Sequence, residues 1–283
     1  MILGLRSALP LALLVCVVLS ASACAPQPMR VTREPQTLRL VAAASCESSA
    51  QRAAEAYEAS RPWVTTDVQV FNTSVAEEVL REGGADVALL SWLWDGVEEP
   101  DVPLWTEGFG RDGVAVIVHP ESSIAEVGLV ELREIFQGRL QEWDGMTLTV
   151  VSREGGSGTR AAFESMVLGG ESPTLNAVVV PSSDSMIEYV ASTPGAIGYV
   201  ATERASGDVR ILPVEGVLPT EQAIADGRYP LWRQLYLATR GEPTGEAREF
   251  CQWLLRGGTR ILSGVTSRRR PAVAREEPDP GGT

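Results

Sequence analysis

The sequence predicts an α/β fold, and three observations lead to that prediction. Segments with the apolar pattern of buried or half-buried strands alternate with segments whose apolar residues recur at helical spacing. Most connections between these segments are short, as in proteins whose helices pack in layers on a sheet. Hydrophobic residues make up 44% and charged residues 22% of the 283 residues, which is the composition of an ordinary globular protein with one or two domains.

Three strand patterns and two helical patterns open the alternating region. The first two strands are apolar or alternate apolar with polar residues, and the third is a continuous apolar run typical of a strand buried on both faces. Each helix ends at a breaker, the first before Pro62 and the second at a pair of glycines. The strands span residues 38–44, 64–71 and 85–91, and the helices span 48–60 and 74–84.

The rest of the chain continues the alternation. Apolar runs predict strands, and apolar residues at helical spacing predict the helices between and after them. One of these helices stops at Gly138, and another, at whose start Asp184 is the predicted N-cap, precedes an apolar strand. The predicted strands span 112–120, 147–152, 196–201 and 230–240, and the predicted helices span 128–138, 158–170, 184–195 and 245–258.

Residues 1–23 have the features of an export signal. Arg6 gives a positive start, an apolar run too short to span a bilayer comfortably follows, and Ala21 and Ala23 make a cleavage site. Cys24 comes next, where a bacterial lipoprotein is acylated, so we expect a lipoprotein signal peptide and a lipid anchor to the cell membrane. Ala21 replaces the leucine usual at that position, so a periplasmic or secreted protein is the alternative. Both interpretations predict an extracytoplasmic protein.

Two apolar-poor segments flank the alternating region. Residues 24–37 are rich in proline and polar residues and are predicted to be a tether. Residues 267–283 contain almost no apolar side chains and are predicted to be a disordered tail. The folded body is therefore expected between them.

Charge and residue content exclude several classes of function. A formal net charge of −13 excludes nucleic acid as a partner. His119 is the only histidine and the cysteine spacing offers no ligand pairs, so neither a metal site nor a cofactor is predicted. Cys46 and Cys251 are the cysteines of the folded body, and they either form a disulfide or are two buried free thiols.

A glycine-rich loop, SREGGSGTRAAF at residues 152–163, joins a predicted strand to a predicted helix. A hydrolase elbow would need Gly-x-Ser-x-Gly, but Thr159 stands at the last position and His119 is the only available base. A P-loop would need a lysine, and the chain contains none. The third interpretation is a cradle for a small anion, and the loop contains every type of residue that such a cradle needs.

The residue types of the loop suit an anion. The first N–H groups of a helix that begins near Thr159 have no helical acceptors, and glycines let an anion approach them. Ser157 and Thr159 add hydroxyls, and Arg153 can offer a forked pair of donors. Glu154 either orients Arg153 or is a solvated turn residue. The alternative is a plain strand-to-helix turn in which Ser157 or Thr159 caps the helix.

Several segments in the right order resemble one known family. The pattern RxxGSGTRxxF, with ELREIFQGRLQEWDG, TPGAIGYV, YPLWRQLYLAT and GADVALLS, is similar to the phosphate-binding proteins of bacterial ABC phosphate transporters over residues 38–265. The resemblance implies a two-lobed type-2 periplasmic-binding-protein fold with a central ligand cleft and hinge strands. It places lobe 1 at 38–112 and 231–266, and lobe 2 at 113–230.

The resemblance also implies a function and a set of ligand residues. The chain would be a monomeric, extracytoplasmic binding protein, not an enzyme, that captures inorganic phosphate for an ABC permease. The implied phosphate-binding residues are Arg153, Ser157, Gly158 and Thr159 of lobe 2, and Ser45, Thr73 and Ser91 of lobe 1.

The chain departs from the family at the loops of lobe 1. Ala42–Ala44 and Asn72 stand where the family has glycines, and Ser91 stands where some members have a carboxylate that accepts the proton of hydrogen phosphate. The alternatives are therefore a sensor or interaction lipoprotein with altered or lost ligand binding, or a binder of another tetrahedral oxyanion. Trp92 and Trp94 either roof the cleft or pack on the lobe.

Overall fold

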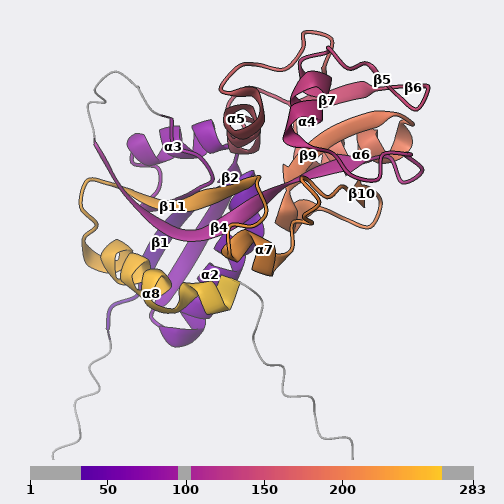
Figure 1. Cartoon of the computed structure of the whole chain (residues 1–283). Coiled ribbons are helices and arrows are strands. Elements are labelled where there is room, and N and C mark those ends of the chain that lie inside the picture. Colours follow the sequence, from indigo (N-terminus) through magenta and orange to yellow (C-terminus); the bar gives the residue numbers. More distant parts are fainter. Residues whose placement is uncertain (1–32, 95–102, 263–283) are drawn as a thin grey trace, which may run out of the picture. The chain divides into compact units, whose positions relative to one another are not determined.

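Three parallel strands, with β1 between β2 and β3, form one end of the sheet (Figure 1). The computed structural model describes residues 33–94 and 103–262. The strands are β1 (Gln36–Ala43), β2 (Val64–Phe71) and β3 (Val87–Leu90), joined by a 3₁₀ turn (Ala44–Cys46) with α2 (Glu47–Ser60), and by α3 (Thr73–Arg81). The first three predicted strands and two predicted helices are thus confirmed.

Two long strands, β4 (Leu104–Val118) and β11 (Trp232–Arg240), continue this sheet. β11 lies between β3 and β4, and β4 exchanges β11 for β9 (Ala196–Ala201) as its partner at Val114. With β7 (Thr149–Arg153) and β8 (Val178–Val180), the resulting order is β2-β1-β3-β11-β4-β9-β7-β8. The sequence predicted only the second part of β4, because residues 104–111 mix polar residues and glycines with apolar ones.

The other end of the sheet contains the glycine-rich loop. Its strands β7 and β9 are parallel neighbours, as are β7 and β8. The sequence did not predict β5, β6, β8, β10 or α7, because segments this short show no periodicity. The bounds are β5 (Glu142–Trp143), β6 (Met146–Thr147), β7 (Thr149–Arg153), β8 (Val178–Val180), β9 (Ala196–Ala201) and β10 (Arg210–Ile211).

Helices cover this end as well. The predicted helix at 158–170 is α5 (Gly158–Phe163), which continues into a π-helical turn (Glu164–Leu168). The other helices are α4 (Leu129–Phe136), α6 (Ser183–Ser192), α7 (Glu221–Ala225) and the C-terminal α8 (Gly245–Leu262), which packs against α2 at the first end of the sheet. A 3₁₀ turn (Thr202–Arg204) follows β9.

Separate apolar clusters lie at the two ends of the sheet. At the first end, Tyr57 of α2 makes edge contacts with Phe250 and Trp253 of α8, at centroid distances of 5.1 and 5.0 Å. At the other end, Phe163 of α5 stacks on Tyr199 of β9, with the ring centroids 4.2 Å apart. Because burial of large aromatic rings is strongly stabilising, this stack fixes α5, and the loop before it, to the sheet.

Several predictions concern residues outside the described ranges. These are the signal peptide 1–23, the acylated Cys24 and the tail 267–283. β1 begins at Gln36, so the last two residues of the predicted tether 24–37 belong to the sheet, where they pair with β2. No helix among the described residues is long and apolar enough to cross a membrane.

Cys46 and Cys251 are buried free thiols, the second of the two alternatives. Burial raises the pKa of each thiol to about 12, so both are protonated at neutral pH. Within residues 33–94 and 103–262, no three His, Cys, Asp or Glu side chains are grouped so as to hold a metal ion.

Candidate anion-binding site

The glycine-rich loop is a tight turn from β7 into α5. Ser157 is the N-cap of α5, and its Oγ accepts a hydrogen bond from the backbone N–H of Arg160 at 3.3 Å. Gly156 has a φ of 81°, a left-handed conformation that glycine adopts without strain. The loop is therefore a strand-to-helix turn capped by Ser157, and the cap leaves the Gly158 N–H directed away from the helix.

Loops from the other end of the sheet lie directly against this turn. The Gly158 N–H donates to Thr73 Oγ1 at 3.1 Å, and Thr73 Oγ1 is 3.1 Å from Ser91 Oγ. The Ser74 N–H donates to the Gly156 carbonyl at 3.1 Å. In Figure 1, α5 accordingly lies on the side of its half that faces α3. The structure thus brings together Thr73, Ser91 and Gly158, which the sequence assigned to opposite lobes.

Two of the glycines in the loop are required by this close approach. A Cβ on Gly158 would lie 2.5 Å from Ser91 Oγ and nearer still to Thr73 Oγ1. A Cβ on Gly156 would collide with the first turn of α3. Gly155, in contrast, has open space where its Cβ would lie. Side chains at positions 156 and 158 would therefore force the two sets of loops apart.

Arg153, at the end of β7, is buried and held in place by two neighbours. Its Nε and NH2 donate to the two carboxylate oxygens of Glu154 at 2.8 and 2.9 Å, and its NH1 donates to Ser183 Oγ at 3.0 Å. The side chain of Arg153 is only 5% exposed. Glu154 therefore orients Arg153, the first of its two alternatives, and two of the five guanidinium N–H groups remain for a ligand.

Thr159 is linked to two residues that the sequence analysis did not identify. Its Oγ1 accepts a hydrogen bond from Arg233 NH1 at 3.1 Å, and Arg233 NH2 donates to Asp112 Oδ2 at 2.8 Å. Arg233 on β11 and Asp112 on β4 are directly paired in the sheet, and both are buried. An available signal was the arginine in the largely apolar strand pattern PLWRQLYLAT.

The protonation of Asp112 depends on opposing effects. Burial raises the pKa of its carboxyl above the ordinary value, while Arg233 and the backbone N–H groups of Gly113 and Thr202 lower it. Burial is the largest of these effects, so the pKa of Asp112 stays above its ordinary value despite the guanidinium beside it.

Another charged group lies near this pair, where α2 meets the turn after β9. Glu203 accepts a hydrogen bond from Ser49 Oγ at 3.3 Å, and its carboxylate is 3.7 Å from Arg52 NH2. Burial, and next the negative charge of Asp112, raise the pKa of Glu203 to about 7, against the effect of Arg52. This carboxyl therefore titrates near neutral pH.

Ser45 lies in the 3₁₀ turn after β1 and is buried, with 6% of its surface exposed. The described contacts do not join it to the other six predicted ligand residues. It does follow the carboxyl end of β1, the parallel neighbour of β3, which Ser91 follows. Ser45 and Ser91 therefore lie at the same edge of the sheet, where ligands of open α/β sheets bind.

The sequence analysis also made predictions about Trp92 and the cap of α6. Trp92 is partly buried and packs against the cluster that contains Phe163 and Tyr199, at the other end of the sheet, so its role stays a prediction. The prediction that Asp184 caps α6 was wrong: Ser182 is the N-cap, and its Oγ accepts from the Ser185 N–H at 3.0 Å. Asp184 lies in the first turn instead, paired with Arg204 at 2.5 Å.

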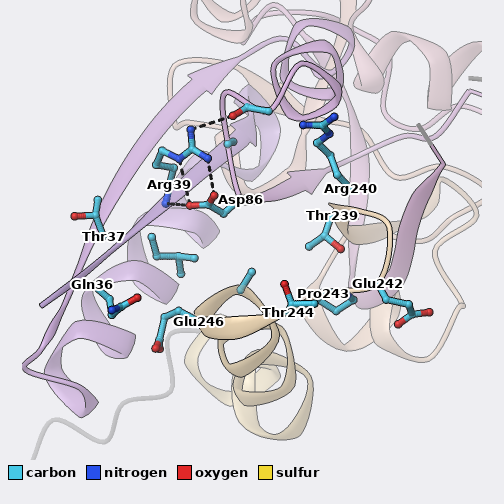
Figure 2. Close-up of a pocket in the computed structure, with 14 residues that line it drawn as sticks. Gln36, Thr37, Arg39, Asp86, Thr239, Arg240, Glu242, Pro243, Thr244 and Glu246 are labelled. Atoms are coloured by element: carbon cyan, nitrogen blue, oxygen red, sulfur yellow. Dashed lines mark hydrogen bonds and ion pairs between the residues drawn. The ribbon is translucent and has the colours of Figure 1, made fainter. Parts of the chain in front are cut away.

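A polar cavity of about 370 Å³ lies at the opposite ends of β1 and β3 (Figure 2). Arg39 pairs there with Asp86 at 2.6 Å, and Arg240 and Glu242 lie across the cavity. None of the predicted ligand residues lines it. The candidate site is accordingly the set of loops at the carboxyl ends of the strands.

Known families and relatives agree with this geometry. A model of the PBP superfamily domain matches residues 31–257. The chain belongs to the PBP superfamily. Within this superfamily, the resemblance to phosphate-binding proteins inferred from the sequence motifs is confirmed by curated relatives.

Two of these relatives show the extent of the similarity. The phosphate-binding protein PstS of Bacillus subtilis is 36% identical over 148 residues, which cover 50% of this chain and 49% of that protein. PstS of Pseudomonas aeruginosa (strain PAO1) is 25% identical over 224 residues, 67% of this chain and 68% of that protein. The chain thus aligns with about half the length of the first of these PBP superfamily relatives.

Solved structures show the same fold. A putative phosphate ABC transporter substrate-binding protein from Clostridium perfringens, with bound phosphate, has a TM-score of 0.73 at 24% identity, covering 80% of this chain and 96% of that one. An ABC-type phosphate transport receptor from Vibrio cholerae has a TM-score of 0.66 at 23% identity, covering 80% and 97%. The predicted two-lobed type-2 periplasmic-binding-protein fold is confirmed.

Proposed function

We propose that this chain is an extracytoplasmic substrate-binding protein that captures inorganic phosphate for an ABC importer. The observation that carries the proposal is the meeting of buried donors from both halves of the sheet at Gly158, Thr73 and Ser91. The names of the curated relatives and the phosphate bound in the related Clostridium structure support the same ligand.

The chemistry of the site suits a dehydrated oxyanion. A buried anion is stable only where hydrogen bonds replace its lost hydration, and bonds from charged or well-aligned donors are the strongest. The Gly158 N–H, the hydroxyls of Thr73, Ser91 and Thr159, and the two remaining N–H groups of Arg153 form such a set. Ser157, as the cap, shapes the turn, and Ser45 adds a hydroxyl at the same edge of the sheet.

Capture follows from the way the two sets of loops meet. The Gly158–Thr73 hydrogen bond joins groups that bind the anion in our proposal, so the bound anion replaces that bond with bonds to each side. An anion held by both sides stabilises the arrangement in which they are close, which is how a ligand shifts a two-lobed protein toward closure. The permease would recognise that arrangement, and no covalent step is involved.

The remaining features of the proposal concern location and organisation. We propose a monomer, anchored to the cell membrane through acylated Cys24, with lobe 1 at 38–112 and 231–266 and lobe 2 at 113–230. The related Vibrio structure is that of an ABC-type phosphate transport receptor, which supports a binding protein rather than an enzyme. Phosphate and the ABC permease are its partners in this proposal.

A second ligand has one observation in its favour. Ser91 contacts Thr73 at the position where some family members have a carboxylate, which requires a proton on the anion. The hydroxyl of Ser91 can donate as well as accept, so it makes no such requirement. A fully ionised tetrahedral anion such as sulfate therefore meets no repelling group at that position.

Calorimetric titration separates these possibilities. The chain starting after Cys24, freed of ligand and shown to be folded, is titrated with phosphate and with sulfate at about pH 5 and about pH 8, on either side of the phosphate ionisation. Phosphate binding with sulfate silent supports phosphate capture. Binding of both anions identifies a general oxyanion site, and heat from neither refutes ligand capture and favours the sensor alternative.

A further inference from the structure

Arg233 connects the glycine-rich loop to the two long strands. Its NH1 donates to Thr159 Oγ1 at 3.1 Å and its NH2 donates to Asp112 Oδ2 at 2.8 Å. The side chain of Arg233 is 2% exposed, and its Nε is buried without a hydrogen-bond partner in the described part of the chain. A buried, incompletely satisfied guanidinium is costly, so a role beyond packing accounts best for its presence.

The hydrogen bond from Arg233 determines what the Thr159 hydroxyl can do. A hydroxyl has one hydrogen to donate and lone pairs that accept. Since Thr159 Oγ1 accepts from a cationic donor, its hydrogen points away from Arg233 and is available to an acceptor on the other side. Thr159 follows Gly158, whose N–H meets Thr73, so this hydrogen belongs to the same set of donors.

We infer that Arg233 is a positioning residue of the anion site: it fixes the Thr159 hydroxyl as a donor to an unprotonated oxygen of the bound anion. This inference rests on the proposed function and deepens it. Donation from a guanidinium also polarises the hydroxyl, which strengthens the hydrogen bond that the hydroxyl makes in turn. Arg233 itself does not contact the anion.

Asp112 makes this arrangement possible. The carboxylate holds one arm of the planar guanidinium, so the other arm is directed at Thr159 without further loss of side-chain freedom. A lysine offers one ammonium group without a rigid fork and cannot reproduce both contacts in this geometry.

Two other roles for Arg233 predict different results. If Arg233 only pairs β11 with β4 through Asp112, its replacement changes stability but not the affinity of the folded protein. If only its positive charge matters, a lysine keeps the affinity and the effects of Arg233 and Thr159 are independent. If it acts through Thr159, the effect of its removal disappears once the hydroxyl is gone.

The test is a double-mutant cycle in phosphate affinity, measured by calorimetry on folded protein. R233Q is combined with D112N so that no unpaired charge is buried, and the cycle contains T159V, R233Q/D112N and all three changes together. T159V loses a hydrogen bond to a charged ligand, so we expect affinity to fall about 10-fold or more, with a comparable fall for R233Q/D112N. On the T159V background, R233Q/D112N is expected to cost less than about 3-fold.

Two single variants complete the experiment. R233K is expected to weaken binding although it keeps the charge, and R240Q, on the same strand but lining the cavity of Figure 2, is expected to leave affinity unchanged. Additive losses in the cycle, or wild-type affinity of R233K, would overturn the role of Arg233 while leaving phosphate capture intact. A folded wild-type protein that does not bind phosphate would overturn the proposed function and this inference with it.

Discussion

Replacing Gly158 with Ala tests the close approach of the two sets of loops. The added Cβ would lie 2.5 Å from Ser91 Oγ and nearer to Thr73 Oγ1, where ordinary contacts are about 3.4–4 Å. Both hydroxyls belong to residues anchored by α3 and β3, so the loops must separate by roughly 1 Å. Overpacking of this kind costs about 1–3 kcal/mol, and weakening of the hydrogen bond that the Gly158 N–H makes to the anion in our proposal costs about 1 kcal/mol more.

These costs fall on the arrangement that holds the anion from both sides. A penalty of about 2–4 kcal/mol corresponds to a loss of phosphate affinity of about 30-fold to 1,000-fold, measured by calorimetric titration. Gly155→Ala is the matched control, because the same methyl group there meets open space and Gly155 has no left-handed φ. Wild-type affinity of Gly158→Ala, or an equal loss in Gly155→Ala, would refute the reasoning.

Other predictions concern the charges of the site. Arg153→Lys keeps the charge but loses the fork that contacts Glu154 and Ser183, so phosphate affinity is expected to fall at least about 10-fold by the same titration; an unchanged affinity would place the anion elsewhere. Because the pKa of Glu203 is raised to about 7, the folded protein keeps a proton on this carboxyl between about pH 4.5 and 7, where the unfolded chain has lost it. The stability that the protonated Glu203 contributes is therefore lost as pH rises through that window. Glu203→Gln is expected to remove this decline, so that the free energy of unfolding rises by about 2 kcal/mol at pH 8 and changes little at pH 4. Urea unfolding measures it across this pH range, and a pH profile parallel to that of the wild type would contradict the assignment. Because both buried arginines are paired with carboxylates, phosphate affinity is expected to change by less than about 3-fold between about 50 and 500 mM NaCl, and a steep salt dependence would show that unscreened net charge drives binding.

The alternation of patterns in the sequence predicted the longer strands and helices, because each carries a repeating apolar face. The first part of β4 lacks such a face: its residues pair with β11 along the stretch that joins the two ends of the sheet, and tertiary pairing determines its conformation. The wrong N-cap at α6 has a local cause. Ser182, Ser183 and Asp184 are all suitable caps, and only the backbone path, extended at Ser182, selects among them.

The candidate site was predictable where a motif marks it. Ser157, Gly158 and Thr159 follow each other in a recognisable loop, whereas Thr73 and Ser91 were assigned through the resemblance alone. Thr73 and Ser91 contact each other and Gly158 only in the folded protein, because α3, β3 and α5 are far apart in the sequence. Spacing in the sequence carries no information about that meeting.

The sequence analysis identified Arg153 but not Arg233, although the two side chains have similar surroundings in the structure. Each is almost fully buried, each has a carboxylate that holds part of its guanidinium, and each donates to a hydroxyl, Ser183 for Arg153 and Thr159 of the glycine-rich loop for Arg233. A paired arginine adds little net charge but keeps its directional donors, so the site can hold an anion without becoming a strongly positive region in the absence of one. A chain with a net charge of −13 can therefore bind an anion. Oriented hydrogen bonds act at short range, so they can hold the anion against the negative potential of the whole protein without an excess of cations.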